Sequence, residues 1–372
     1  MNDRLVQNIN HKKKRLGISI YPEYASTEEI LIYIRKAYDL GFSRIFTCLI
    51  SSDGTIEGIE KQFGAWSRPA FEMGFDIIAD VSPDVFKSLN VSLSDLSLFK
   101  SLGFSGIRLD LGFSGHEESL MSFNPQGLSI ELNMSNGTKY IDNILSYEAN
   151  KSNIIGCHNF YPHRYTGLSQ AHFELCSAQF KTLGIRTAAF VSSQQAAYGP
   201  WPVSEGLCTL ESHRNLPIDV QAKDLFQTGL IDDVIIANMF ASDEELSALS
   251  QVNRDKLVLK VERLVDLSAE EAAILFDEPH FNRGDVSEYV IRSTQSRVKY
   301  AQSTFELKNA RDMVEGDIII ESSLYTRYAG ELHVALKAMQ NSGKSSVVAR
   351  VVPEERYLIH RIKPWQSFGL TE

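Results

Sequence analysis

The chain has 372 residues, of which 43% are hydrophobic and 23% charged, a composition typical of a folded globular protein rather than a disordered one. Its formal net charge of −10 argues against broad binding to nucleic acid or to acidic membranes, which requires a basic surface. The length exceeds that of one ordinary domain, so we expect two domains.

A short basic segment, HKKKR (11–15), precedes the first apolar run. That run is interrupted at Tyr21-Pro22-Glu23, which is too soon for a signal peptide or a membrane helix. We therefore expect residues 1–15 to form a flexible tail and the protein to be cytoplasmic.

Eight short apolar runs, each ending in polar or charged residues, follow along the first two thirds of the chain. Most are separated by helical patterns, and this alternation predicts an α/β fold, a TIM (β/α)8 barrel over residues 16–253. In such a barrel the active site lies at the carboxyl ends of the strands. The runs are LGISIYPE (16–23), RIFTCLI (44–50), DIIADVSP (76–83), GIRLDLGF (106–113), LSIELNMSN (128–136), IIGCHNFYP (154–162), RTAAFVSS (186–193) and DVIIANMF (233–240), and helices are expected at 26–41, 92–103, 169–184 and 243–252.

The pattern changes after about residue 253. Strand-like segments now follow one another without long crossover helices, as antiparallel pairing permits. We expect a small, mainly β domain over residues 254–372. Its expected strands are 256–264, 317–322, 330–336, 346–352 and 357–362, with a short helix at 268–276.

Period-two alternation predicts which residues near the strand ends face the barrel axis. In GIRLDLGF, Ile107, Leu109 and Leu111 form the apolar side toward the outer helices, so Arg108 and Asp110 are expected inside.

The same argument directs Glu131 and Asn133 inward on the next strand and groups Glu23 with Ser19 and Tyr21 on the first. Charged groups inside a barrel require partners, and a barrel built only for stability favours aliphatic side chains there. We therefore interpret these residues as parts of a site.

Asp110 and Glu131 lie on consecutive strands and are expected to approach each other within several ångströms. Their repulsion would raise the pKa of one carboxyl group, while Arg108 would keep the other ionised. Two carboxyl groups with separated pKa values suit glycoside hydrolysis. Asp110, Glu131 and Glu23 are the candidate catalytic residues, and a structural ion pair of Arg108 with Asp110 and a structural role for Glu131 remain open alternatives.

Further polar residues near the strand ends are candidates for substrate binding. His158 and His163 lack a metal-binding spacing, and the four cysteines form no C-x-x-C pair, so we expect no metal and no cofactor. The candidates for substrate binding are Arg108, Asn133, His158, Asn159, Tyr161, His163, Glu205 and Asn238.

Several segments together resemble the 6-phospho-N-acetylmuramidase family of bacterial cytoplasmic glycosidases. GCHNFYPHRYTGLS (156–169) is the most specific of them, and the others include GISIYPE, GIRLDLGF, RSTQSR (292–297) and YTRYAGELHVAL. The resemblance implies a TIM barrel followed by a cyclophilin-like domain. It also implies hydrolysis of N-acetylmuramic acid 6-phosphate β-1,4-linked to N-acetylglucosamine, in peptidoglycan recycling of the cell wall. One departure is Cys208, which stands where this family is expected to have proline.

The phosphorylated amino-sugar disaccharide implied by this resemblance requires cationic groups. Arginine pairs with phosphate in a bidentate manner, and hydroxyl groups add donors. We expect the second domain, folded over the barrel mouth, to supply Arg292, Ser293, Arg297 and Arg327, although a solvated surface role is equally open. Arg108 and Arg164 of the barrel are the alternative.

Two other functions remain possible. A lyase or aldolase acting on a sugar phosphate would use a lysine Schiff base or a metal, but no lysine closes any of the eight runs. A non-catalytic carbohydrate-binding protein is the second alternative, against which the expected lack of an export signal argues. No nucleic-acid or membrane partner is expected, and the oligomeric state and the stereochemistry of hydrolysis remain open.

Overall fold

The computed structural model describes residues 13–49, 55–196, 198–200 and 205–372. These residues fall into two compact units that divide between Val252 and Asn253. Most of the predicted tail, residues 1–12, lies outside the described part of the chain. The first strand already begins at Arg15.

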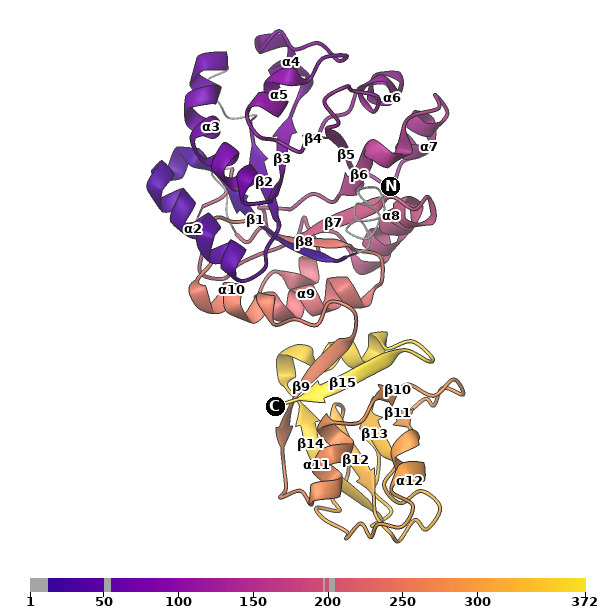
Figure 1. The fold of residues 1–372 in the computed structure, drawn as a ribbon. Coiled ribbons are helices and arrows are strands. Elements are labelled where there is room, and N and C mark those ends of the chain that lie inside the picture. Colours follow the sequence, from indigo (N-terminus) through magenta and orange to yellow (C-terminus); the bar gives the residue numbers. More distant parts are fainter. Residues whose placement is uncertain (1–12, 50–54, 197, 201–204) are drawn as a thin grey trace, which may run out of the picture. The chain divides into compact units, whose positions relative to one another are not determined.

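The first unit is a closed barrel of eight parallel strands, in the order β1 to β8 (Figure 1). The barrel closes where β1 pairs with β8, with Arg15 opposite Asp233. The fold is therefore a TIM barrel, as the eight runs predict. The strands are β1 Arg15–Ile20, β2 Arg44–Cys48, β3 Asp76–Val81, β4 Gly106–Leu109, β5 Ser129–Asn133, β6 Ile154–Cys157, β7 Arg186–Val191 and β8 Asp233–Ile236.

Helices connect the strands and cover the outside of the barrel (Figure 1). The first of them, α2, begins with a capping box in which Ser26 and Glu29 satisfy each other's backbone amides. Its buried residues include Ile30, Ile34 and Ala37, at the spacing of one helix face. The helices are α2 Thr27–Asp39, α3 Ile56–Glu72, α4 Pro83–Ser88, α5 Ser97–Ser101, α6 His116–Met121, α7 Tyr140–Leu145, α8 Gln170–Thr182, α9 Ile218–Gln227 and α10 Asp243–Ser250, with short 3-10 helices η1 Pro22–Tyr24, η2 Lys151–Asn153 and η3 Glu211–His213.

Two expectations for the barrel differ from the structure. The helix expected at 92–103 is only the short α5, because the segment before it forms a turn in which Ser92 bridges Asp95. Leu111 does not pack against outer helices but is 67% exposed, since β4 already ends at Leu109. The alternation rule holds only while the chain remains extended.

The second unit contains a seven-stranded sheet in the order β10-β15-β9-β14-β12-β13-β11. Most neighbours are antiparallel, but β15 runs parallel to β9. The unit is thus mainly β, as predicted. Its elements are β9 Leu257–Arg263, α11 Ala269–Phe276, β10 His280–Phe281, β11 Val290–Ser293, α12 Gln295–Lys299, β12 Asp317–Glu321, β13 Leu332–Ala335, β14 Ser345–Val351, η4 Pro353–Arg361 and β15 Ser367–Thr371.

One strand expected in this unit is wrong. Residues 357–362 lie in the 3-10 helix η4 and in the residue after it. Leu358 and Ile359 are buried within this helical segment, so two adjacent apolar residues that also fit a strand belong here to a helical turn. Among the described residues, no helix is long and apolar enough to cross a membrane.

Candidate functional site

Asp80, Arg108 and Asp110 form a charged cluster at the carboxyl ends of β3 and β4. Asp80 and Arg108 are register partners on the two strands, and Asp110 follows the last residue of β4. Nη1 of Arg108 donates to Oδ1 of Asp80 at 2.9 Å and to Oδ1 of Asp110 at 3.1 Å. One guanidinium group therefore holds two carboxyl groups at the end of the barrel where active sites of this fold lie.

The three side chains differ in exposure. Those of Arg108 and Asp80 are 3% and 10% exposed, whereas that of Asp110 is 33% exposed. Asp110 is thus accessible to a ligand, and Asp80 lies deeper beside it.

Polar groups from β5 and from the segment after β6 surround this cluster. Nη2 of Arg108 donates to Oδ1 of Asn159, and Nδ2 of Asn133 approaches Oδ1 of Asp110 at 3.4 Å. Burial raises the pKa of the Tyr161 phenol, on which the charges of Arg108 and Asp110 also act. The structure therefore brings together four residues predicted from the sequence: Arg108, Asp110, Asn133 and Asn159.

The two carboxyl groups have different electrostatic surroundings. Burial is the main cause that raises the pKa of Asp80 to about 7, with Asp110 adding repulsion and Arg108 opposing both. Burial disfavours the charge of Arg108, but Asp80 and Asp110 outweigh this and raise its pKa, so the guanidinium remains charged. Near neutral pH this site can hold a proton on Asp80 beside a permanent positive charge.

Asp80 was not among the residues selected from the sequence. The sequence does contain an indication of this residue, because the charged Asp80 interrupts the apolar strand DIIADV. Asp80 also lies opposite Arg108 on the neighbouring strand. This pairing can be predicted only when the register of the two strands is known.

Glu131 is the register partner of Arg108 on β5, but its side chain contacts a second group of charges in the barrel. Its side chain is fully buried and forms an ion pair with Arg44, which also donates to Asp233 at 2.7 Å. Asp233 further accepts hydrogen bonds from Arg15 and Arg186. Four strands begin with a residue of this group: β1 with Arg15, β2 with Arg44, β7 with Arg186 and β8 with Asp233. These four residues, the amino-terminal charge layer, therefore lie at the end of the barrel opposite to Asp110.

The side chains of His158 and Asn238 form internal hydrogen bonds with residues outside the charged cluster. His158 is buried, with Nδ1 and Nε2 at 3.1 and 2.8 Å from the hydroxyl groups of Ser135 and Ser177. Burial lowers its pKa to about 3, so the ring is neutral. Asn238 accepts from the backbone N–H of Ser193 at 2.8 Å and donates back to its carbonyl at 2.9 Å.

Glu23, His163 and Glu205 are exposed residues in loops at the carboxyl end of the barrel. Glu205 approaches Arg164 at 3.4 Å, and Nδ1 of His163 lies 2.7 Å from the carbonyl oxygen of Arg164. These contacts order the loop after β6. Any role in ligand binding for these three residues stays a prediction.

Aromatic side chains line another part of the same end of the barrel. Tyr24 and Tyr198 stack with ring centroids 5.3 Å apart and remain about 40% exposed. Phe240, directly after the β8 region, packs edge-on against Tyr198 and has a φ of +67°, a strained conformation for a bulky residue. Such strain occurs at functional sites, and flat apolar faces of this kind suit one face of a sugar ring.

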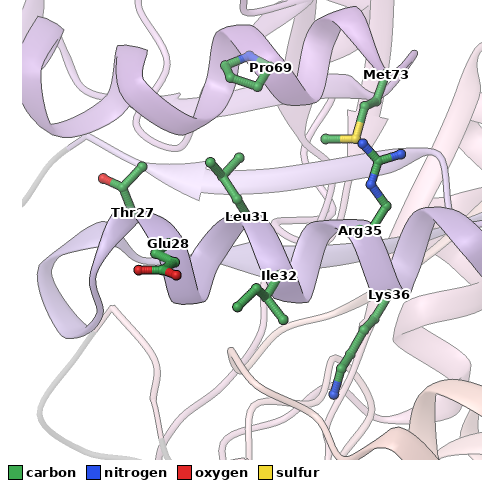
Figure 2. A pocket seen from close by; sticks show the side chains of 8 residues that line it. All are labelled: Thr27, Glu28, Leu31, Ile32, Arg35, Lys36, Pro69 and Met73. Carbon is green, nitrogen blue, oxygen red and sulfur yellow. The ribbon is translucent and has the colours of Figure 1, made fainter.

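Two hollows in the first unit lie away from the charged cluster. One, of about 730 Å³, lies between α2 and α3, where Leu31 is directed toward Pro69 and Met73 (Figure 2). The other, of about 550 Å³, lies at the starts of α9 and α10 and is lined by Asp219, Glu244 and Glu245 among others.

TIM barrels often bind phosphate near the loops after strands 7 and 8. In this barrel the carboxylates of the second hollow would repel phosphate. Among the described residues, no group of three or more His, Cys, Asp or Glu side chains is arranged to hold a metal ion.

The arginines selected in the second unit surround a buried carboxylate. Arg292 and Arg297 pair with Glu331 at 2.9 and 2.7 Å. Ser293 is buried, with its hydroxyl 2.9 Å from Nδ1 of His280, whereas Arg327 is exposed.

Comparison with protein families accounts for nearly the whole chain. Residues 16–251 match the model described as 6-phospho-N-acetylmuramidase, N-terminal, and residues 257–371 match the model of its C-terminal part. The chain belongs to the 6-phospho-N-acetylmuramidase family. The resemblance found in the sequence is thereby confirmed.

Two solved structures are similar to this chain over nearly its whole length. The structure of an uncharacterised protein from B. cereus is 45% identical, has a TM-score of 0.90, and matches over 97% of this chain and all of that one. A conserved Enterococcus faecalis protein with an unknown function is 25% identical with a TM-score of 0.69, and 96% of each chain is covered. Comparison with curated proteins gives no match. The chain thus shares its architecture along its length with an uncharacterised protein and with one of unknown function.

Proposed function

We propose that the protein is a glycosidase that hydrolyses N-acetylmuramic acid 6-phosphate β-1,4-linked to N-acetylglucosamine. The observation that carries this proposal is the pair of carboxyl groups, Asp80 and Asp110, on one guanidinium group at the carboxyl end of a TIM barrel. Family membership supports the choice of substrate.

Glycoside hydrolysis requires one carboxyl group that is protonated and one that is ionised. The raised pKa of Asp80, caused mainly by burial, supplies a proton near neutral pH. Asp110 is more exposed and lies 3.1 Å from the guanidinium group of Arg108. The pair therefore suits acid-catalysed cleavage of a glycosidic bond.

The alternatives have less support. A Schiff-base aldolase needs a lysine at the site, but the charged cluster of Asp80, Arg108 and Asp110 contains none. A carbohydrate-binding protein gains nothing from a buried carboxyl group whose ionisation is costly, whereas catalysis does. We further propose a cytoplasmic role in peptidoglycan recycling, with Arg292, Arg297 and Arg327 as candidate phosphate ligands.

The decisive experiment is incubation of the purified protein with the disaccharide in its phosphorylated and unphosphorylated forms. Release of N-acetylglucosamine from the phosphorylated form only is expected. Equal cleavage of both would contradict the substrate assignment, and binding of either without cleavage would favour the carbohydrate-binding alternative.

A further inference from the structure

We propose that Asp80 and Asp110 are the two catalytic residues and that hydrolysis retains the β configuration, with Asp80 donating the proton and Asp110 attacking the sugar. This inference rests on the proposed function and deepens it.

The separation of the two carboxyl groups leads to this stereochemistry. Their Oδ1 atoms lie 2.9 and 3.1 Å from the same nitrogen of Arg108, so these atoms are at most about 6 Å apart. Retaining glycosidases hold their carboxyl groups roughly 5–5.5 Å apart, and inverting enzymes hold them about 6.5–9.5 Å apart to admit a water molecule. The upper limit that Arg108 sets for these two atoms lies below the inverting range, so the geometry favours the retaining arrangement.

The surroundings of the two groups assign their roles. Asp80 is nearly buried between β3 and β4, where the neutral acid is favoured. Asp110 is one-third exposed and lies near Nδ2 of Asn133. Arg108 contacts both groups, so it compensates whichever carboxyl group is charged as the proton moves.

The proposed reaction has two balanced steps. An oxygen of Asp110 forms a bond to C1 of the muramic acid while the bond from C1 to the glucosamine O4 breaks, and Asp80 gives its proton to that O4. Water then attacks C1 and gives a proton to Asp80, and the bond from C1 to Asp110 breaks. Each step inverts C1, so the pair of steps restores the β configuration.

The first test follows the product by proton NMR immediately after enzyme is added to the phosphorylated disaccharide. The β anomer of N-acetylmuramic acid 6-phosphate is expected first, with the α anomer appearing only by slow mutarotation. Initial α anomer would overturn this inference and leave the proposed function intact, whereas no cleavage would contradict the proposed function itself.

The second test separates the two roles with Asp80→Asn and Asp110→Asn. Loss of a general acid typically costs about 10²- to 10⁴-fold in rate. Asp80→Asn is expected to lose this factor on the disaccharide but much less on a 4-nitrophenyl β-glycoside of the same sugar phosphate, whose leaving group needs no proton. Asp110→Asn is expected to lose activity on both substrates.

Asp224→Asn is the matched control, because Asp224 on helix α9 is also a buried aspartate and pairs with His213 at 2.8 Å. It is expected to retain kcat even if its stability falls. Folding of each variant is checked by circular dichroism and thermal unfolding. Wild-type kcat in folded Asp80→Asn would overturn its role as acid, and retained activity of folded Asp110→Asn would assign the attack to the substrate's own acetamide instead.

Discussion

At the scale of single residues, the charged cluster shows how position alone separates two aspartates. Asp80 and Asp110 contact the same nitrogen of Arg108, yet only Asp80 is enclosed between strands. Burial raises its pKa to about 7. The protein thereby keeps an acid protonated at a pH at which an exposed aspartate is fully ionised.

This pKa predicts how activity depends on pH. If Asp80 is the proton donor, kcat/KM is expected to fall about tenfold per pH unit above pH 7, because a general acid works only in its protonated form. The measurement is kcat/KM for the phosphorylated disaccharide from pH 5 to 9. A rate that stays constant up to pH 9 would contradict the role of Asp80.

Glu131 is a candidate catalytic residue for which the sequence also leaves a structural role open. Its side chain is fully buried against Arg44, which favours the structural role. Glu131→Gln is expected to act mainly on stability, since removing one partner of a buried ion pair costs about 3–5 kcal/mol. Urea unfolding and kcat measured on the same preparation test this, and unchanged stability with lost kcat would restore the catalytic assignment.

At the scale of elements, the loops after β1, β7 and β8 supply the aromatic surface of Tyr24, Tyr198 and Phe240. Its rings are held against one another and two remain exposed. This leaves apolar faces at the same end of the barrel as the charged cluster.

Replacement of one ring tests whether this surface binds the sugar. Tyr24→Ala is expected to raise KM up to about tenfold with less effect on kcat, since an aromatic contact contributes roughly 0.5–1.5 kcal/mol. Tyr38→Ala is the control, because Tyr38 is similarly exposed but packs against Phe75, which directly precedes the first residue of β3. An equal effect in both variants would contradict a sugar-binding role.

In the second unit, β11 and α12 carry Arg292 and Arg297 beside Glu331. If these arginines bind the phosphate, Arg297→Gln is expected to reduce kcat/KM for the phosphorylated disaccharide by about ten- to hundredfold. An unphosphorylated substrate or analogue would be affected little. Arg311→Gln is a close control, since Arg311 is similarly exposed and also pairs with a buried carboxylate, that of Asp317.

At the scale of the whole molecule, the sequence predicts the barrel well because each of its eight strands is a buried apolar run. The sequence pattern does not predict the edge strands β10 and β11, which are short, or the inner strand β15, which pairs with β10 and β9. The segment 357–362 was misassigned because apolar residues on one face of a helical turn imitate a strand over so short a length. Which polar residues meet depends on strand register, so the sequence indicated Arg108 and Asp110 but not Asp80.

The amino-terminal charge layer is a second property of the whole barrel, because it joins β1, β2, β7 and β8. The surrounding arginines hold the pKa of buried Asp233 well below its usual value, although burial opposes them. A depressed carboxyl pKa stabilises the fold at pH values above about 4, the pKa of aspartate in the unfolded chain, and this stabilisation is lost as pH falls toward the folded-state value.

Replacement of Asp233 tests how much this carboxylate contributes to the stability of the fold. Asp233→Asn is expected to lower the free energy of unfolding by about 3–5 kcal/mol at pH 7, because buried guanidinium groups lose their counter-ion. Urea titrations at pH 7 and pH 3 measure it, and the difference from wild type is expected to shrink at pH 3, which lies below the pKa of aspartate in the unfolded chain. A variant as stable as wild type at pH 7 would contradict this role.

The amino-terminal charge layer also affects how the chain folds during its synthesis. Asp233 follows Arg15 by 218 residues and Arg44 by 189, so the ribosome has completed nearly the whole barrel before this shared counter-ion exists. Until Asp233 has been synthesised, the guanidinium groups of the earlier strands cannot pair with it. The incomplete barrel also lacks the pairing of β1 with β8 that closes it. Chains released before β8 are therefore expected to be poor intermediates for folding and ready substrates for proteases.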